Sequence, residues 1–208
     1  MQKNYPISNQ EKIIGVNSRF GNPGIAKQQG TTVEIYDTLP LPTAGGSNVV
    51  LDFFIDAKTR SFPFTNLKDG KLPPQEAFVA NRIYFYVVKE VISTGKKTMF
   101  PLFANDTSLG SLLNNAGIDG LGEVEISISN NRVLKPIPLT SFAPNFNAGD
   151  DSQNNVLQLD TQLVFPPQLE FKLSLKLSSA NAAPEDTQIY IAAVMGGVGA
   201  IFSPKSNF

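Results

Sequence analysis

The chain contains no cysteine, no histidine and no tryptophan among its 208 residues. The lack of cysteine excludes a disulfide framework and a thiolate metal site. The lack of histidine removes the commonest general base, the usual partner of an activated nucleophile and the favoured zinc ligand. We therefore predict a protein that is not an enzyme, with no catalytic residues, no metal site and no cofactor.

Charged residues are also scarce. Lysine and arginine number 17 and aspartate and glutamate 18, which gives a net charge of −1. Charged side chains make up 17% of the chain, against about a quarter in an average domain. Nucleic-acid-binding proteins usually carry a basic stripe, so we expect no specific nucleic-acid recognition. Amide and hydroxyl side chains supply the remaining polarity, as in proteins whose surface is largely covered by neighbours.

Long apolar runs are missing too. No segment approaches the roughly 18 apolar residues of a membrane helix. The opening sequence MQKNYPISNQEKIIG lacks the apolar core of a secretion signal, which favours synthesis in a cytoplasm. Hydrophobic residues still form 41% of the chain, enough for a sizeable core, and the length suits one all-β domain.

What the chain does have is clear β-strand patterning, above all in residues 162–177, QLVFPPQLEFKLSLKL. After the break at Pro166 and Pro167, apolar and polar side chains alternate strictly. The apolar positions are Leu169, Phe171, Leu173, Leu175 and Leu177, and the polar ones are Glu170, Lys172, Ser174 and Lys176. Because strand side chains point to opposite faces with a period of two, this segment predicts a half-buried strand with a polar outer face.

Similar patterns predict eight or nine strands in all. The predicted strands are residues 31–37, 49–55, 81–92, 98–103, 122–129, 132–139, 156–165, 169–177 and 188–202. Pro136 and Pro138 indicate an edge strand or a strand end, because proline cannot donate to a ladder. One short helix is expected from Asp106 or Thr107 to Gly117.

These elements predict an all-β fold: an antiparallel Greek-key sandwich, a single jelly roll of eight to nine strands with one short helix. Residues 1–30, rich in Gly, Asn and Pro, are predicted to form an extended N-terminal arm, and residues 31–208 the jelly-roll sandwich domain.

Two carboxylate clusters are candidates for chemistry. Glu123 and Glu125 lie two apart on a predicted strand, so they share a face at about 6–7 Å, a separation that a glycosidase pair could use. Ser127 and Ser129 continue the same row, which favours an ordinary solvent face. In the loop 147–155, Asp150, Asp151 and three asparagines offer oxygen ligands for calcium, but their spacing matches no EF-hand.

Three further motifs have plain structural interpretations. The Gly-Lys of residues 93–98 lacks the upstream glycine of a P-loop, so a hairpin turn with two exposed lysines is expected. Gly196, Gly197 and Gly199 stand in strand-like sequence and suggest a bulge or a close backbone approach. The sequon at Asn105 is expected to be idle without a secretion signal.

Phenylalanines crowd both strands and loops: Phe53, Phe54, Phe62, Phe64, Phe78, Phe100, Phe103, Phe142 and Phe146. Without tryptophan, a carbohydrate-stacking platform lacks its favoured residue. Packing in the core is favoured over an interface with another subunit by about two to one, because scattered apolar residues are usually core.

Residues 60–87 (RSFPFTNLKDGKLPPQEAFVANRIYFYV), 132–142 (RVLKPIPLTSF) and 165–175 (FPPQLEFKLSL) occur in an order that resembles jelly-roll capsid proteins of tailless icosahedral phages, including internal-membrane types. In that family an irregular segment ending in KL-x-x-x-E-x-F precedes a central strand, and a PPQ turn leads into a late strand. Double jelly-roll major capsid proteins generally exceed 208 residues. The resemblance therefore implies a single jelly-roll capsid, penton or spike-base protein, or a compact two-lobe variant.

The resemblance implies a virion structural protein, a capsid subunit that assembles with copies of itself into trimers or pentamers and contacts other capsid proteins. A lipid membrane inside the shell is a further candidate partner. The N-terminal arm would contact neighbours, membrane or genome, and the apolar C-terminal strand would take an intersubunit or core position. The alternative is a carbohydrate-binding or adhesin β-sandwich of a phage or cell surface. A third hypothesis is a glycoside-active enzyme using Glu123 and Glu125.

Overall fold

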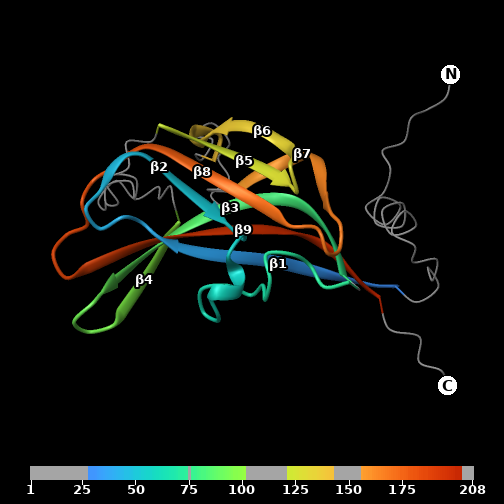
Figure 1. Ribbon diagram of the computed structural model, residues 1–208, viewed down its shortest axis with the longest axis horizontal. Helices are drawn as coiled ribbons and strands as arrows, with labels where there is room; N and C mark the ends of the chain where they lie inside the picture. The colour runs from blue at the N-terminus through green and yellow to red at the C-terminus, as the bar shows by residue number, and fades with distance from the viewer. Residues whose placement is uncertain (1–27, 75, 102–120, 143–155, 203–208) are drawn as a thin grey trace, which may run out of the picture.

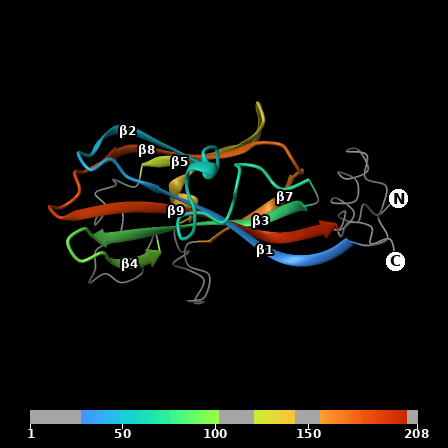
Figure 2. The same ribbon diagram turned by 60° about the horizontal axis from the view of Figure 1, so that its bottom comes forward.

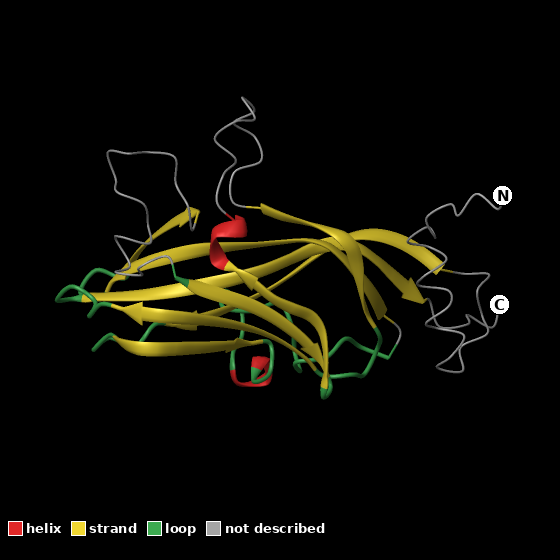
Figure 3. Ribbon diagram, turned by 90° about the horizontal axis from the view of Figure 1, so that it is seen from above, coloured by secondary structure: helices red, strands yellow, loops and turns green. Residues whose placement is uncertain are grey.

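The computed structural model describes residues 28–74, 76–101, 121–142 and 156–202. Nine strands lie in these residues, with two short 3-10 turns, η2 (Ala57–Thr59) and η3 (Leu139–Phe142) (Figure 3). The strands form two antiparallel sheets that face each other (Figures 1 and 2). The predicted all-β, antiparallel sandwich is confirmed.

The first sheet has the order β1-β9-β3-β4, with β7 also paired to β3. Its strands are β1 (Gln28–Pro40), β3 (Glu76–Val91), β4 (Lys96–Pro101), β7 (Val156–Phe165) and β9 (Thr187–Phe202). Both β4 and β7 pair along the same edge of β3, β7 over its first half and β4 over its second.

The second sheet has the order β2-β8-β5-β6. Its strands are β2 (Gly46–Phe53), β5 (Gly122–Ile128), β6 (Asn131–Pro138) and β8 (Phe171–Ala180). The proline-containing β6 lies at the edge, as its sequence predicts, because neither Pro136 nor Pro138 has an N–H to donate.

The strand pairing is nested. The first strand pairs with the last (β1 with β9), the second with the next to last (β2 with β8), then β3 with β7 and β5 with β6. Only β4 stands outside this scheme, as a hairpin extension of β3. Pairing of β3 with β9 and of β5 with β8 then joins the nested pairs into the two sheets.

Several strand bounds differ from those predicted. β1 begins at Gln28, inside the segment predicted as an arm, while residues 1–27 lie outside the described residues. β3 begins at Glu76 rather than at residue 81, because pairing with β7 and β9 recruits alanine-containing sequence of low intrinsic strand preference. β8 begins at Phe171, since Gln168 turns the chain with a φ of 63°.

The alternation predicted for β8 is confirmed on its inner face but not throughout its outer face. Phe171, Leu173, Leu175 and Leu177 are buried. Ser174, expected on the solvent side, is buried as well. Its hydroxyl donates to a carboxylate oxygen of Asp52 at 2.6 Å, so the serine is covered by a neighbouring strand of its own sheet.

Phenylalanine rings bridge the two sheets in two contact chains. Phe85 of β3 lies 6.3 Å from Phe53 and 5.2 Å from Phe142, centroid to centroid. The second chain links Phe54, Phe171, Phe165 and Phe78 through centroid distances of 5.4, 4.9 and 5.6 Å. These rings are at most 2% exposed, so they carry much of the apolar burial between the sheets.

A buried ion pair holds the segment after β2 against β1. The Asp37 carboxylate is fully buried and accepts two bonds from Arg60, Nε at 2.9 Å and Nη2 at 2.6 Å. The Phe54 backbone N–H donates to the same carboxylate at 2.7 Å. Two bonds in a fork geometry plus a backbone donor satisfy the charge inside the protein.

Replacing Asp37 by Ala should lower the free energy of unfolding by about 3–5 kcal/mol, because Arg60 would lose the partner of a buried pair. Equilibrium urea denaturation measures this loss. The matched control is Lys172→Ala, which breaks the more exposed pair with Asp52 at 3.5 Å and should cost at most about 1 kcal/mol. Equal losses in the two variants would contradict this role of Asp37.

Candidate functional site

A groove of about 490 Å³ runs along the outer face of the first sheet. Four of its lining positions are tyrosines and most of the others are apolar. The lining residues are Glu34, Tyr36, Thr38, Pro63, Phe64, Tyr84, Tyr86, Val88, Lys97, Met99, Tyr190, Ala192 and Val194. They come from β1, β3, β4 and β9 and from the turn before Thr65, so this surface exists only once the sheet has formed.

The register of the sheet explains why the surface is hollow. On the outer face of β9, Val194 lies between Tyr36 of β1 and Tyr84 of β3. Two residues earlier on the same face of β9, Ala192 lies between Thr38 and Tyr86. Directly opposed side chains have Cβ atoms about 4.5–5.5 Å apart, so small residues on the middle strand leave a trough between taller neighbours.

One end of the groove carries an ion pair between β1 and β3. A guanidinium nitrogen of Arg82 lies 2.7 Å from Glu34 Oε1. Arg82 and Glu34 flank Gly196 of β9, where a Cβ would meet the Arg82 guanidinium, so glycine leaves room for this pair.

The same pair sets the protonation of its neighbours. The hydrogen bond from Arg82 holds the pKa of Glu34 below its ordinary value. Burial raises the pKa of Tyr84 well above its ordinary value, and the hydrogen bond to Glu34 raises it further. Tyr84 therefore stays a neutral phenol that donates to a carboxylate.

The other end carries a second ion pair. Lys97 Nζ lies 3.4 Å from Glu90 Oε1 and 5.0 Å from the centre of the Phe64 ring. Phe64 in turn contacts Tyr190, with ring centres 5.6 Å apart. Burial raises the pKa of Tyr190, and a hydrogen bond to Glu90 adds to the rise. Each end of the groove thus pairs one acid with one base, and an uncharged aromatic trough lies between them.

This arrangement suits binding of an apolar, uncharged surface. The middle of the groove offers ring faces and aliphatic carbon, and its charged groups are already paired. Among the described residues no group of three or more Asp, Glu, His or Cys side chains could hold a metal ion. The loop 147–155 with Asp150 and Asp151 lies outside the described residues.

Glu123 and Glu125 do share the outer face of β5, as predicted, but basic side chains engage both. Lys176 Nζ lies 2.9 Å from Glu123 and 3.3 Å from Glu125, and Arg132 lies 3.1 Å from the second oxygen of Glu125. The two glutamates raise the pKa of Lys176 through hydrogen bonds. The geometry is that of a surface ion-pair cluster, and neither glutamate lines the tyrosine groove.

The other motifs have the structural roles expected of them. Residues 92–95 form the turn of the β3–β4 hairpin, and Lys96 and Lys97 at the start of β4 are exposed. Gly197 allows a close backbone approach at the β-bulge between Ala80 and Arg82, because a Cβ there would collide with the Val79 carbonyl oxygen. The apolar C-terminal strand β9 lies between β1 and β3, with one side in the core and the other lining the groove.

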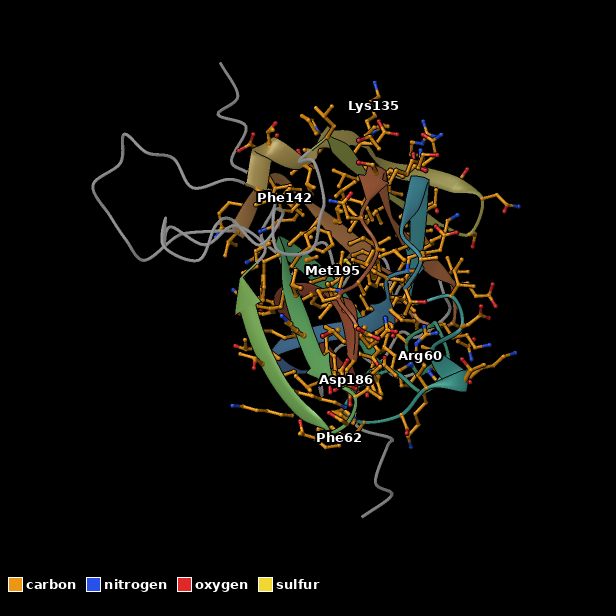
Figure 4. All side chains as sticks on the ribbon, turned by 90° about the vertical axis from the view of Figure 1, so that its left-hand side faces the viewer. Arg60, Phe62, Lys135, Phe142, Asp186 and Met195 are labelled. Carbon is orange, nitrogen blue, oxygen red and sulfur yellow. The ribbon has the colours of Figure 1, made fainter. Side chains whose placement is uncertain are left out.

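The phenylalanines divide between core and surface. Phe53, Phe54, Phe78 and Phe142 are buried, whereas Phe62 is 82% exposed and Phe64 lines the groove. Figure 4 shows Phe62 at the outer surface, Phe142 and Met195 further inside and Lys135 on the opposite side. The predicted helix from Asp106 or Thr107 to Gly117, the sequon at Asn105, Phe103 and Phe146 lie outside the described residues.

Sequence reasoning missed the groove itself. Tyr84, Tyr86 and Val88 alternate within a strand predicted as central, and Tyr190, Ala192 and Val194 alternate within the last one. The usable signal was tyrosine recurring every second residue, because a wholly buried face seldom repeats a side chain with a hydroxyl.

Tyr84 should ionise above the ordinary tyrosine pKa of about 10. Glu34→Gln should lower the pKa of Tyr84 part of the way, because the negative charge of the carboxylate disappears while burial remains. Ultraviolet titration of tyrosinate measures this, with Tyr84→Phe identifying the late-ionising group. A higher pKa in Glu34→Gln, or an unchanged late ionisation in Tyr84→Phe, would contradict the assignment.

None of the helices among the described residues is both long and apolar enough to cross a membrane. Comparison of the chain with models of protein families, with curated proteins and with solved structures finds no match.

Proposed function

We propose that this protein is a self-assembling structural subunit of a virion shell, built as a single jelly roll and without enzymatic activity. The observation that carries the proposal is the nested pairing of the first strand with the last, the second with the next to last, and so on inward. A long antiparallel hairpin that wraps into two facing sheets produces this order, and jelly rolls of eight strands are a recurrent fold of viral capsid subunits. Without β4, the remaining eight described strands follow this nested order.

The two outer faces of the sandwich support the proposal because they differ in chemistry. The face of the second sheet carries the ion pairs of Lys172 and Lys176 and suits contact with water. The face of the first sheet carries the tyrosine groove, with Phe62 and Met99 82% and 62% exposed. Exposed aromatic and apolar surface of this kind marks a region that another protein covers.

At the outer edge of β1, backbone groups are already hydrogen-bonded to Asn66. This favours association between the faces of the sheets over pairing of β1 with a strand of another copy. The Asn66 side chain accepts from the Tyr36 N–H at 2.9 Å and donates to the Glu34 carbonyl at 2.7 Å. These bonds occupy backbone groups that another strand would otherwise pair with. A subunit protected in this way can associate in a defined geometry instead of aggregating edge to edge.

The partners proposed are copies of the same chain, in trimers or pentamers, and other capsid proteins, with an internal membrane as a further candidate. The proposed location is the virion, after synthesis in the host cytoplasm. The network around Glu123 and Glu125 is proposed as an ion-pair cluster of the outer face, because Lys176 pairs with both carboxylates and Arg132 pairs with that of Glu125.

The second candidate function is that of a carbohydrate-binding sandwich, which the four groove tyrosines favour because sugars stack on aromatic rings. Sugar hydroxyls also need free polar partners, and Glu34 and Glu90 are already bonded to Arg82 and Lys97. For this reason we place it second. Saturable binding on a glycan array, lost in Tyr86→Ala, by a protein that stays monomeric would reverse the order.

The full chain should self-associate in a concentration-dependent manner. Size-exclusion chromatography with light scattering should give a molar mass several times that of the 22.5 kDa chain, with threefold or fivefold multiples expected. Negative-stain microscopy of the same fractions should show rings or closed particles. A molar mass of one chain at every concentration would contradict the proposed function.

A further inference from the structure

We propose that the tyrosine groove is a contact site between two copies of this chain, and that the exposed Phe62 of each copy seats in the groove of the other. This inference rests on the proposed function and names the surface by which two subunits meet. Its occupant is a second copy, presenting the turn of residues 61–64.

The turn that carries Phe62 is held firmly in place. The Phe64 N–H donates to the Ser61 carbonyl at 2.8 Å, which closes the turn. Phe64 is fixed between Tyr190 and Lys97, at 5.6 Å and 5.0 Å from its ring centre. The ring of Phe62, in contrast, is 82% exposed. A rigid support beneath a free aromatic ring lowers the entropy cost of placing that ring in a partner.

Phe62 and the groove lie next to each other on the same molecule, because Pro63 and Phe64 are groove-lining residues. When a protruding group and its receptor are neighbours, a twofold axis beside them brings each protrusion to the receptor of the other copy. Such an isologous contact closes on itself and uses both features twice. In a shell, contacts of this symmetry join one trimer or pentamer to the next.

The size of the surface fits a protein contact. One side of a standard interface uses about 20–30 residues. The groove alone is lined by 13 residues, about half of that number, before the Ser61–Phe62 tip is counted. An aromatic ring such as Phe62 buries roughly 150–250 Å² and is typical of interface hot spots.

The charges also match. The tip of the turn, Ser61 to Phe64, carries no charged side chain. The centre of the groove is uncharged, and at its ends Glu34 is paired with Arg82 and Glu90 with Lys97. Seating the turn therefore leaves no charge buried without a partner, which would otherwise oppose the contact strongly. The ion pairs form a polar rim around an apolar centre, as protein interfaces do.

The absence of cysteine makes this contact testable by site-specific cross-linking. Ser61→Cys is placed in one preparation and Met99→Cys, at the exposed lip of the groove, in another carrying a different tag. The two are mixed and treated with a short bis-maleimide. We expect a strong cross-link between the differently tagged chains.

Two controls isolate the contact. Val50→Cys, 53% exposed on β2 of the other sheet, replaces Met99→Cys and should give only background. Phe62→Ser, added to both cysteine variants, should reduce the Ser61–Met99 cross-link at least about tenfold, because a central aromatic residue often dominates the binding energy of an interface. Because Phe62 is exposed in the single chain, this variant should stay folded, with the circular dichroism spectrum of the wild type.

The outcomes separate the two proposals. If the wild-type chain self-associates but Ser61→Cys links no better to Met99→Cys than to Val50→Cys, the contact site is wrong and the structural function stands. If the wild-type chain stays monomeric, the proposed function fails, and the contact with it. Saturable glycan binding in the groove without any inter-copy link would also overturn the contact.

Discussion

The structure depends on one strand, β9, which is hydrogen-bonded along both of its edges. Its partner on one side is β1 and on the other β3, each over almost its whole length. The inner side of β9 contributes Ile189, Ile191, Ala193 and Met195 to the core, all at most 4% exposed. Since β9 is the last of the described strands, the first sheet is complete only when this strand has been placed. Its pairing with both β1 and β3 joins the outermost nested pair to the β3–β7 pair in one sheet.

The outer side of the same strand sets the chemistry of the surface. Val194 lies between Tyr36 and Tyr84, and Ala192 lies between Thr38 and Tyr86. Gly196 gives room for Arg82 to reach Glu34. One row of side chains therefore determines the depth of the groove and the position of the charges at one end. The second sheet has ion pairs on its outer face instead. A sandwich with one hydrated face and one aromatic face is suited to being covered on one side only, which links the fold to self-association.

Much of the fold could be predicted from local sequence. Alternation in residues 122–128 and 171–177 reports strand identity and the buried face directly, because the side-chain period is two. Which residues contact each other across the fold cannot be predicted from local sequence. Asp37 and Arg60 are 23 residues apart in different segments, and no pattern in either indicates that they form a buried pair. The groove is harder still, since Tyr36, Tyr84 and Tyr190 reach one surface only through the register of three strands.

Predicting Ser174 as solvent-facing fails for the same reason, because its burial depends on Asp52 of a strand more than 120 residues earlier.

The central claim, that the aromatic face of one copy is covered by another, is tested most directly by electron cryomicroscopy of the assembled full chain. The account predicts particles in which the Phe62 turn of a neighbouring copy fills each tyrosine groove. Particles in which copies meet elsewhere and leave every groove open to solvent would contradict it.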